Sequence, residues 1–154
     1  MAIYLIRHAI ADKKSQWNGP DTTRPLSEAG RLQAKALANE IGPLAPTWLV
    51  SSPYLRCMQT LQCLSELTDL PIFGDDRLAE DSEIATAIEM IINAPDGAVM
   101  CSHGDIIPAI IRLLEGRGML FTTVPDWRKA SVWVLERQGA TFTSAAAWQP
   151  PSAG

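Results

Sequence analysis

The chain is poor in the residues that build metal sites and disulfide frameworks. It has only two histidines and three cysteines, Cys57, Cys63 and Cys101, an odd number without close paired spacing. Structural zinc sites and disulfide scaffolds draw on four or more such residues, usually at short regular spacings. The sequence therefore predicts neither a disulfide framework nor a metal site, and we expect no cofactor.

Two common ways of handling phosphate are missing as well. A cysteine-dependent phosphatase needs an arginine six positions after its nucleophilic cysteine, but those positions here hold Cys63, Asp69 and Ile107. No Gly-rich stretch matches the phosphate loop of nucleotide hydrolases. Both chemistries are excluded.

Positive charge and long hydrophobic runs are scarce. The 13 basic residues are outnumbered by 17 acidic ones, so the formal net charge of -4 provides no overall positive field for nucleic acid or an anionic membrane. The apolar run within residues 1–7 is too short for a signal peptide or a membrane span. We expect a cytoplasmic protein with no nucleic acid or membrane partner, in which any anion site is local.

The chain does contain short apolar runs followed by helical patterns. Runs at 2–6, 47–50 and 98–101 predict buried strands, and two further runs near the C-terminus predict a hairpin around Gly139. This alternation is typical of the α/β class. We predict a single three-layer domain over residues 1–148, with a mainly parallel sheet flanked by helices. Beyond it we expect a flexible tail.

Four helices are predicted between these strands. Ser27 and Ser52 are the expected N-caps of the first two, with Pro53 at the first helical position of the second. A third helix is predicted over residues 82–93. The fourth follows Gly104.

Polar clusters follow three of the predicted strands, at residues 7–9, 51–56 and 102–104. Ligands of open α/β sheets bind beyond the carboxyl ends of the strands, so both histidines should meet Arg7 and Arg56 at one edge. Arg56 stands in the first turn of its helix, where the helix dipole disfavours a cation by about 0.3–1 kcal/mol. A bound anion would reverse that cost, which favours a phosphate site.

These residues suit phosphoryl transfer to a histidine. A neutral imidazole can attack phosphorus at physiological pH, while arginines neutralise the phosphoryl oxygens. Each residue alone has an ordinary explanation, such as capping by Ser52 or a surface ion pair of Arg56. Their joint occurrence favours the chemical interpretation, although spacing alone does not choose between His8 and His103 as the nucleophile.

Three segments, 5–9, 51–60 and 102–104, resemble the signatures of the histidine phosphatase superfamily, also called phosphoglycerate-mutase-like, in the same order and spacing. The resemblance covers nearly the whole chain and implies that superfamily's fold. It also implies a phosphatase that works through a covalent phosphohistidine intermediate. The implied roles are nucleophile for His8, phosphate ligands for Arg7 and Arg56, and a phosphate ligand that stabilises the transition state for His103.

The short length and the segment 21–27 resemble the small SixA-type branch, whose members act on phosphohistidine in proteins. The resemblance implies a phosphohistidine-bearing protein as substrate and partner, and it places Asp21 near the site as the favoured acid. Glu80 is the alternative, since larger relatives supply a glutamate. Ala9 stands where the superfamily usually has glycine, so a positive φ at that position would strain the backbone.

Two other functions remain open. A small-molecule phosphomonoesterase or a phosphoglycerate mutase-type enzyme would use the same machinery, although the chain lacks the long insertions that close a lid over a small substrate. A non-catalytic phosphate-binding module would bind phosphate without turnover, because a fold alone does not establish activity.

Overall fold

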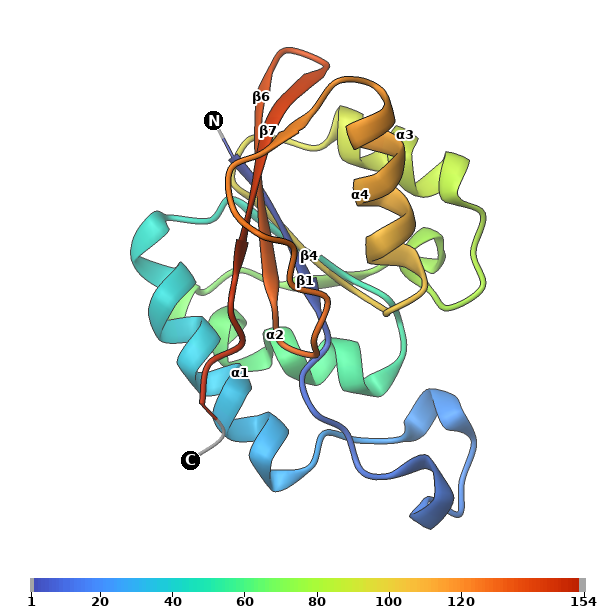
Figure 1. Ribbon diagram of the computed structural model, residues 1–154. Coiled ribbons are helices and arrows are strands. Elements are labelled where there is room, and N and C mark those ends of the chain that lie inside the picture. The colour runs from blue at the N-terminus through green and yellow to red at the C-terminus, as the bar shows by residue number, and fades with distance from the viewer. Residues whose placement is uncertain (1, 153–154) are drawn as a thin grey trace.

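The computed structural model describes residues 2–152, and Figure 1 shows its central sheet. The strands lie in the order β3-β2-β4-β1-β6-β7-β5. β1 (Ala2–Arg7) pairs in parallel with β4 (Ala98–Ser102), β4 with β2 (Trp48–Ser51), and β2 with β3 (Ile72–Gly74). The three apolar runs thus form neighbouring buried strands, as predicted.

The other half of the sheet begins at β6 (Val132–Gln138), which is antiparallel to β1. β6 forms a hairpin with β7 (Thr141–Trp148), and Gly139 lies in its turn with φ at 60°. β5 (Leu120–Phe121) adds to β7 in parallel. The predicted hairpin is confirmed, and β1 separates a parallel half of the sheet from a mainly antiparallel one.

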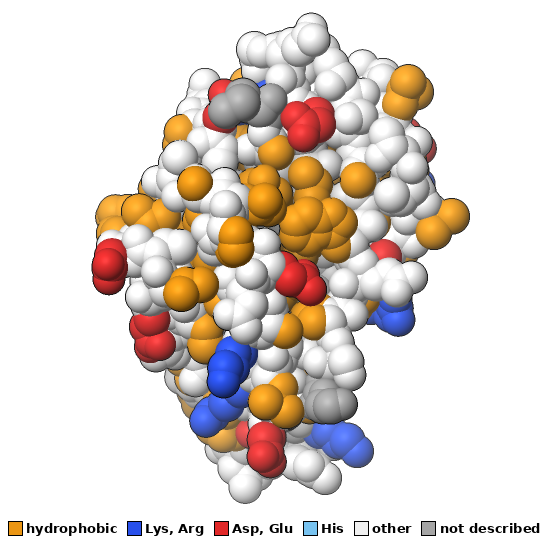
Figure 2. Space-filling view, turned by 90° about the vertical axis from the view of Figure 1, so that its left-hand side faces the viewer, with side chains coloured by type: hydrophobic (Ala, Val, Ile, Leu, Met, Phe, Trp, Pro, Cys, Tyr) orange, Lys and Arg blue, Asp and Glu red, His pale blue; other side chains and the backbone are white. Residues whose placement is uncertain are grey.

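Helices cover both faces of the sheet (Figure 1). α1 (Glu28–Ile41) and α2 (Leu55–Thr68) pack on one face, and α3 (Ile84–Asn93) and α4 (Ile106–Gly116) on the other, each pair forming its own hydrophobic core. On the side that carries α1, hydrophobic side chains gather near the middle, with charged side chains around them (Figure 2). The three-layer α/β architecture is confirmed. Four short 3-10 helices lie at Lys14–Gln16, Asp21–Thr23, Gly42–Leu44 and Asp76–Leu78.

The predicted N-caps had different outcomes. Ser27 caps α1, and its hydroxyl accepts a hydrogen bond from the amide of Gly30. Ser52 does not cap α2, so that prediction is wrong: the helix begins at Leu55 after Tyr54. Instead, the hydroxyl of Ser52 lies 2.8 Å from Nε2 of His103. The side chain that the local sequence pattern predicted as a helix cap thus makes a tertiary hydrogen bond.

The register of the parallel strands brings their carboxyl ends together. Arg7 lies beside Ser102, and Ser51 lies beside Cys101. The polar residues that follow these strands must therefore share one edge of the sheet, as the sequence predicted.

The C-terminal segment after β7 runs along α1, where the Gln33 amide donates to the carbonyl of Pro151. Residues 153–154 lie outside the described residues, and the flexible tail over 149–154 stays a prediction. Within residues 2–152 the structure has no helix with the length and apolar character needed to span a membrane.

Candidate active site

His8 lies directly after β1 and is almost fully buried, with 5% of its surface exposed. Its Nδ1 is 2.8 Å from the carbonyl oxygen of Ala9, which can only accept, so Nδ1 carries the proton. The other ring nitrogen, Nε2, therefore holds the lone pair. The backbone amide of His8 donates to Ser102, which fixes the residue against β4. His8 is thus held in one tautomer, with the nitrogen suited to attack left free.

The surroundings of His8 keep its ring neutral. Burial is the main cause that lowers its pKa from 6.5 to about 3; the Ala9 hydrogen bond opposes this shift, and the neighbouring Arg56, His103 and Arg7 add to it. The imidazole is consequently unprotonated across the physiological pH range. A neutral ring is the form that can act as a nucleophile.

This low pKa predicts a specific dependence of stability on pH. Between pH 6.5 and about 3 the unfolded chain binds a proton on His8 and the folded chain does not, so the folded state loses stability as the pH falls. At pH 7 the contribution is absent. Replacing His8 with Gln should make acid unfolding less steep, on the order of 1 kcal/mol per pH unit in this window. Urea unfolding of both proteins at pH 7, 5.5 and 4.5 measures it, and parallel curves would contradict it.

Ala9 fits its position without strain. It is fully buried and is not among the non-glycine residues with positive φ. Its amide donates to the hydroxyl of Thr60, which in turn donates to the carbonyl of Arg56. The glycine usual in the superfamily is thus not required here, and Thr60 ties the nucleophile's segment to α2.

Arg7 and Arg56 reach the same site from β1 and α2. The Nη1 of Arg7 donates to the carbonyl of Trp127 at 2.7 Å, and its guanidinium lies flat against Gly104, where a Cβ atom would approach its Cζ to 2.7 Å. Arg56 is 1% exposed, and its guanidinium also stacks 5.0 Å from the ring of Tyr54. Contacts within the protein thus hold both guanidinium groups in place without a bound substrate.

His103 completes the group. It is fully buried, its ring lies 5.6 Å from that of His8, and its Nε2 is 2.8 Å from the hydroxyl of Ser52. Tyr54 packs edge-on against it at 4.7 Å and donates its own amide to Ser52. Since the Ser52 hydroxyl already accepts this amide, it can donate to Nε2 and leave the proton of His103 on Nδ1.

Unpartnered nitrogen atoms gather at this site. Of the buried side-chain nitrogens and oxygens in residues 2–152, four lack a hydrogen-bond partner, and three of them are Arg7 Nε, Arg56 Nε and His103 Nδ1. Burying a donor without a partner is costly, so such atoms call for an acceptor. A phosphoryl group offers several oxygens to accept from all three.

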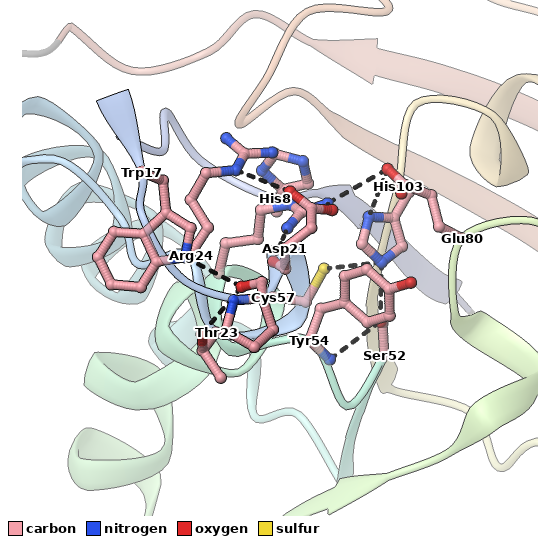
Figure 3. Close-up of polar contacts among 12 residues, drawn as sticks. His8, Trp17, Asp21, Thr23, Arg24, Ser52, Tyr54, Cys57, Glu80 and His103 are labelled. Atoms are coloured by element: carbon pink, nitrogen blue, oxygen red, sulfur yellow. Dashed lines mark hydrogen bonds and ion pairs between the residues drawn. The ribbon is translucent and has the colours of Figure 1, made fainter. Parts of the chain in front are cut away.

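Asp21 and Glu80 both form ion pairs with Nη2 of Arg56, and Figure 3 shows the two carboxylate side chains. Asp21 accepts hydrogen bonds from Arg24 at 3.0 Å and Arg56 at 3.1 Å, and Glu80 accepts from Arg56 at 3.2 Å. Burial raises the pKa of Asp21, but the hydrogen bonds and charges of Arg24 and Arg56 outweigh it, so the pKa lies below its ordinary value. Asp21 is therefore a carboxylate at neutral pH. Glu80 has a second contact, because its Oε1 lies 3.7 Å from Nδ1 of His103.

A pocket of about 370 Å³ opens over these groups. Among the predicted residues it is lined by His8, Arg7, Arg56 and Glu80, but not by Asp21 or by the fully buried His103. Arg24 and Lys129 also line it. The sequence predicted a role for neither: Arg24 lies within the segment 21–27 but was not singled out, and no motif marks Lys129. Within the described residues no group of three or more His, Cys, Asp or Glu side chains is placed to hold a metal ion.

The fold and this site can be compared with known proteins. A relative from Mycolicibacterium smegmatis, an 8-oxo-(d)GTP phosphatase, is 29% identical over 155 residues, which cover 97% of this chain and 48% of the relative. The chain thus spans about half of that relative's length.

Two solved structures share the fold over nearly the whole chain. The protein histidine phosphatase SixA complexed with tungstate has a TM-score of 0.78 at 17% identity, covering 99% of this chain and 97% of SixA. A mycobacterial glucosyl-3-phosphoglycerate phosphatase has a TM-score of 0.69 at 20% identity, covering 97% and 99%. At these identities the likeness shows the fold alone.

The family comparison covers the segment that carries the first two clusters of the site. The family model for the histidine phosphatase superfamily (branch 1) matches residues 3–83, more than half of the chain. Together with the arrangement of His8, Arg7 and Arg56, this match means that the chain belongs to the histidine phosphatase superfamily.

Proposed function

We propose that the domain over residues 1–148 is a phosphatase that transfers a phosphoryl group to Nε2 of His8 and then to water. The observation that carries this proposal is the neutral His8 ring beside three buried donors without a partner. The donors fit the oxygens of a phosphoryl group, and the free lone pair of Nε2 is the nucleophile that such a group would meet.

In the proposed mechanism each of these residues has a part. As Nε2 attacks phosphorus, positive charge develops on the ring. The proton stays on Nδ1, which keeps its hydrogen bond to the Ala9 carbonyl. Arg7, Arg56 and His103 bind the phosphoryl oxygens, whose negative charge spreads in the transition state. The leaving group departs with the electrons of the broken bond. Water then attacks the phosphohistidine, which releases inorganic phosphate and restores the neutral ring.

The first substrate candidate is a protein that carries phosphohistidine. The fold matches the protein histidine phosphatase SixA along nearly its whole length. The leaving group of that substrate is an imidazole, which departs readily without a strong acid. Asp21, held as a carboxylate by two arginines, is unsuited to protonate a poorer leaving group.

The second candidate is a small phosphorylated molecule. The relative that matches 97% of this chain acts on 8-oxo-(d)GTP, and the fold also matches a glucosyl-3-phosphoglycerate phosphatase. A parallel panel of phosphohistidine protein, phosphoserine peptide, sugar phosphates and phosphoglycerates with their bisphosphate cofactor separates the two candidates and exposes mutase activity. A non-catalytic module would bind phosphate in a single-turnover assay but release none from any substrate.

The two carboxylates should respond differently to neutralisation. Asp21→Asn removes the partner that orients Arg56, so we expect similar severalfold losses on phosphoserine peptide and on phosphohistidine protein. Glu80→Gln should impair the phosphoserine ester far more than phosphohistidine, because an alkoxide needs a proton and imidazole does not. Measured kcat values on both substrates test this. An Asp21→Asn enzyme impaired only on the ester would return the acid role to Asp21, the residue that the sequence favoured.

A further inference from the structure

Lys129 lines the pocket over His8 but plays no part in the mechanism above. Its side chain is half-buried. Among residues 2–152 it has no ion pair or side-chain hydrogen bond, in contrast to Arg24 and Arg56, which are bound by carboxylates. A half-buried cation without a counterion is costly unless a ligand supplies the negative charge.

The backbone holds Lys129 firmly at the nucleophile. The next residue, Ala130, is fully buried, and its amide approaches the carbonyls of Arg7 at 3.0 Å and His8 at 3.2 Å. Ala130 has φ at 66°, in the left-handed region that alanine rarely adopts. Such local strain persists where the surrounding structure enforces it and is frequent at ligand sites. The backbone next to Lys129 is therefore held by hydrogen bonds to the end of β1 and to His8.

Three arginines act electrostatically on Lys129. Burial lowers the pKa of Lys129, and the charges of Arg7, Arg24 and Arg56 lower it further. Although Glu80, Asp81 and Asp105 line the same pocket, none forms an ion pair with Lys129. The transferred phosphoryl group is already matched by Arg7, Arg56 and His103. The cation at Lys129 is thus left for a second negative group.

The space around Lys129 has room for such a group. The pocket of about 370 Å³ is several times larger than one phosphoryl group requires. Arg7 and Lys129 also border a neighbouring hollow of about 550 Å³, lined in addition by Ile10, Gln33 and Pro151. A substrate that places one phosphate over His8 and the next at Lys129 can extend its remaining part into this hollow.

We propose that Lys129 forms a second anion subsite, which gives the enzyme a further activity: hydrolysis of the terminal phosphoryl group of phosphoanhydrides such as nucleoside diphosphates. This inference rests on the proposed phosphoryl transfer at His8. Nε2 attacks the terminal phosphorus, the bond to the bridging oxygen breaks, and the electron pair leaves with the nucleoside monophosphate. Water then releases phosphate from His8 and gives one proton to solvent. The phosphate leaving group needs no proton, so the step requires no general acid from Asp21 or Glu80.

The test compares substrates with and without the second anion. ADP and inorganic pyrophosphate carry it, whereas p-nitrophenyl phosphate does not. Lys129→Met keeps the length of the side chain and removes its charge. We expect it to lower kcat/KM on ADP and pyrophosphate by about tenfold or more, mainly through KM, and to leave p-nitrophenyl phosphate within about twofold. Lys129→Arg should retain most of the ADP activity. Lys35→Met, an exposed lysine on α1, is the matched control and should change neither activity.

The outcomes separate the two proposals. An enzyme that hydrolyses p-nitrophenyl phosphate but neither ADP nor pyrophosphate would overturn the subsite and leave the phosphatase proposal standing. Equal losses of Lys129→Met on all three substrates, at unchanged melting temperature, would also overturn it, because Lys129 would then serve the transferred phosphoryl group. Absence of turnover on all three, with no phosphoenzyme on His8, would instead contradict the phosphatase proposal itself.

Discussion

A His8→Ala variant is expected to lose at least about a thousandfold in kcat on every phosphorylated substrate, because it lacks the only group proposed to form the covalent intermediate. The wild-type protein, stopped with base during turnover of a ³²P-labelled substrate, should carry an acid-labile, base-stable label. The variant should carry none. The amount of ³²P that stays on each protein tests for the phosphoenzyme, and steady-state rates measure the loss of kcat.

The matched measurement is binding of inorganic phosphate. Arg7, Arg56 and His103 remain in the His8→Ala protein, so it should still bind phosphate, which distinguishes loss of the nucleophile from loss of the fold. If the variant hydrolysed p-nitrophenyl phosphate at the wild-type rate, a group other than His8 would be the nucleophile.

An Arg56→Ala variant is expected to lose about 10²-fold or more in kcat, since a positive charge next to the developing negative charge is removed. The buried guanidinium also holds Asp21 and Glu80, so its removal leaves these two carboxylates without their shared partner. Arg56→Lys should recover only part of the activity, because an ammonium cannot reproduce the planar fork.

Arg31→Ala provides the comparison for this second prediction. Arg31 is an exposed residue of α1 that does not line the pocket, and within residues 2–152 its side chain forms no ion pair. Its loss should change neither kcat nor the melting temperature appreciably. If Arg56→Ala kept more than about a third of wild-type kcat, Arg56 would not be a ligand of the reacting phosphoryl group.

The sequence predicted the parts of the fold that long or regular patterns specify. The apolar runs that became β1, β2 and β4, and the hairpin around Gly139, are long enough to be recognised. β5, with two residues, and β3, with three, are not, because so short a strand is defined by its pairing partner. Ser52 shows the same limit: its hydroxyl contacts a histidine that lies 51 positions away in the sequence.

The site residues likewise fall into those that regular sequence patterns specify and those that tertiary contacts place. His8, Arg7, Arg56 and His103 stand beside strand ends or helix starts, so topology alone brought them together. Arg24 and Lys129 belong to the pocket through loop conformations that no periodicity describes. The contacts of Asp21 were equally beyond the sequence, because one of the two arginines that bind its carboxylate lies 35 positions away in the chain.

The position of β1 between two kinds of strand has a consequence for how this protein can evolve. On its parallel side, α2 and the loop after β4 supply the groups proposed to transfer the phosphoryl group. On its antiparallel side, only the loop between β5 and β6 reaches the pocket, and it brings Lys129. Substitutions in that loop can change which substrates are accepted while the reacting groups stay in place. On these proposals, the residues that assist phosphoryl transfer and the residue that selects the substrate lie on opposite sides of β1.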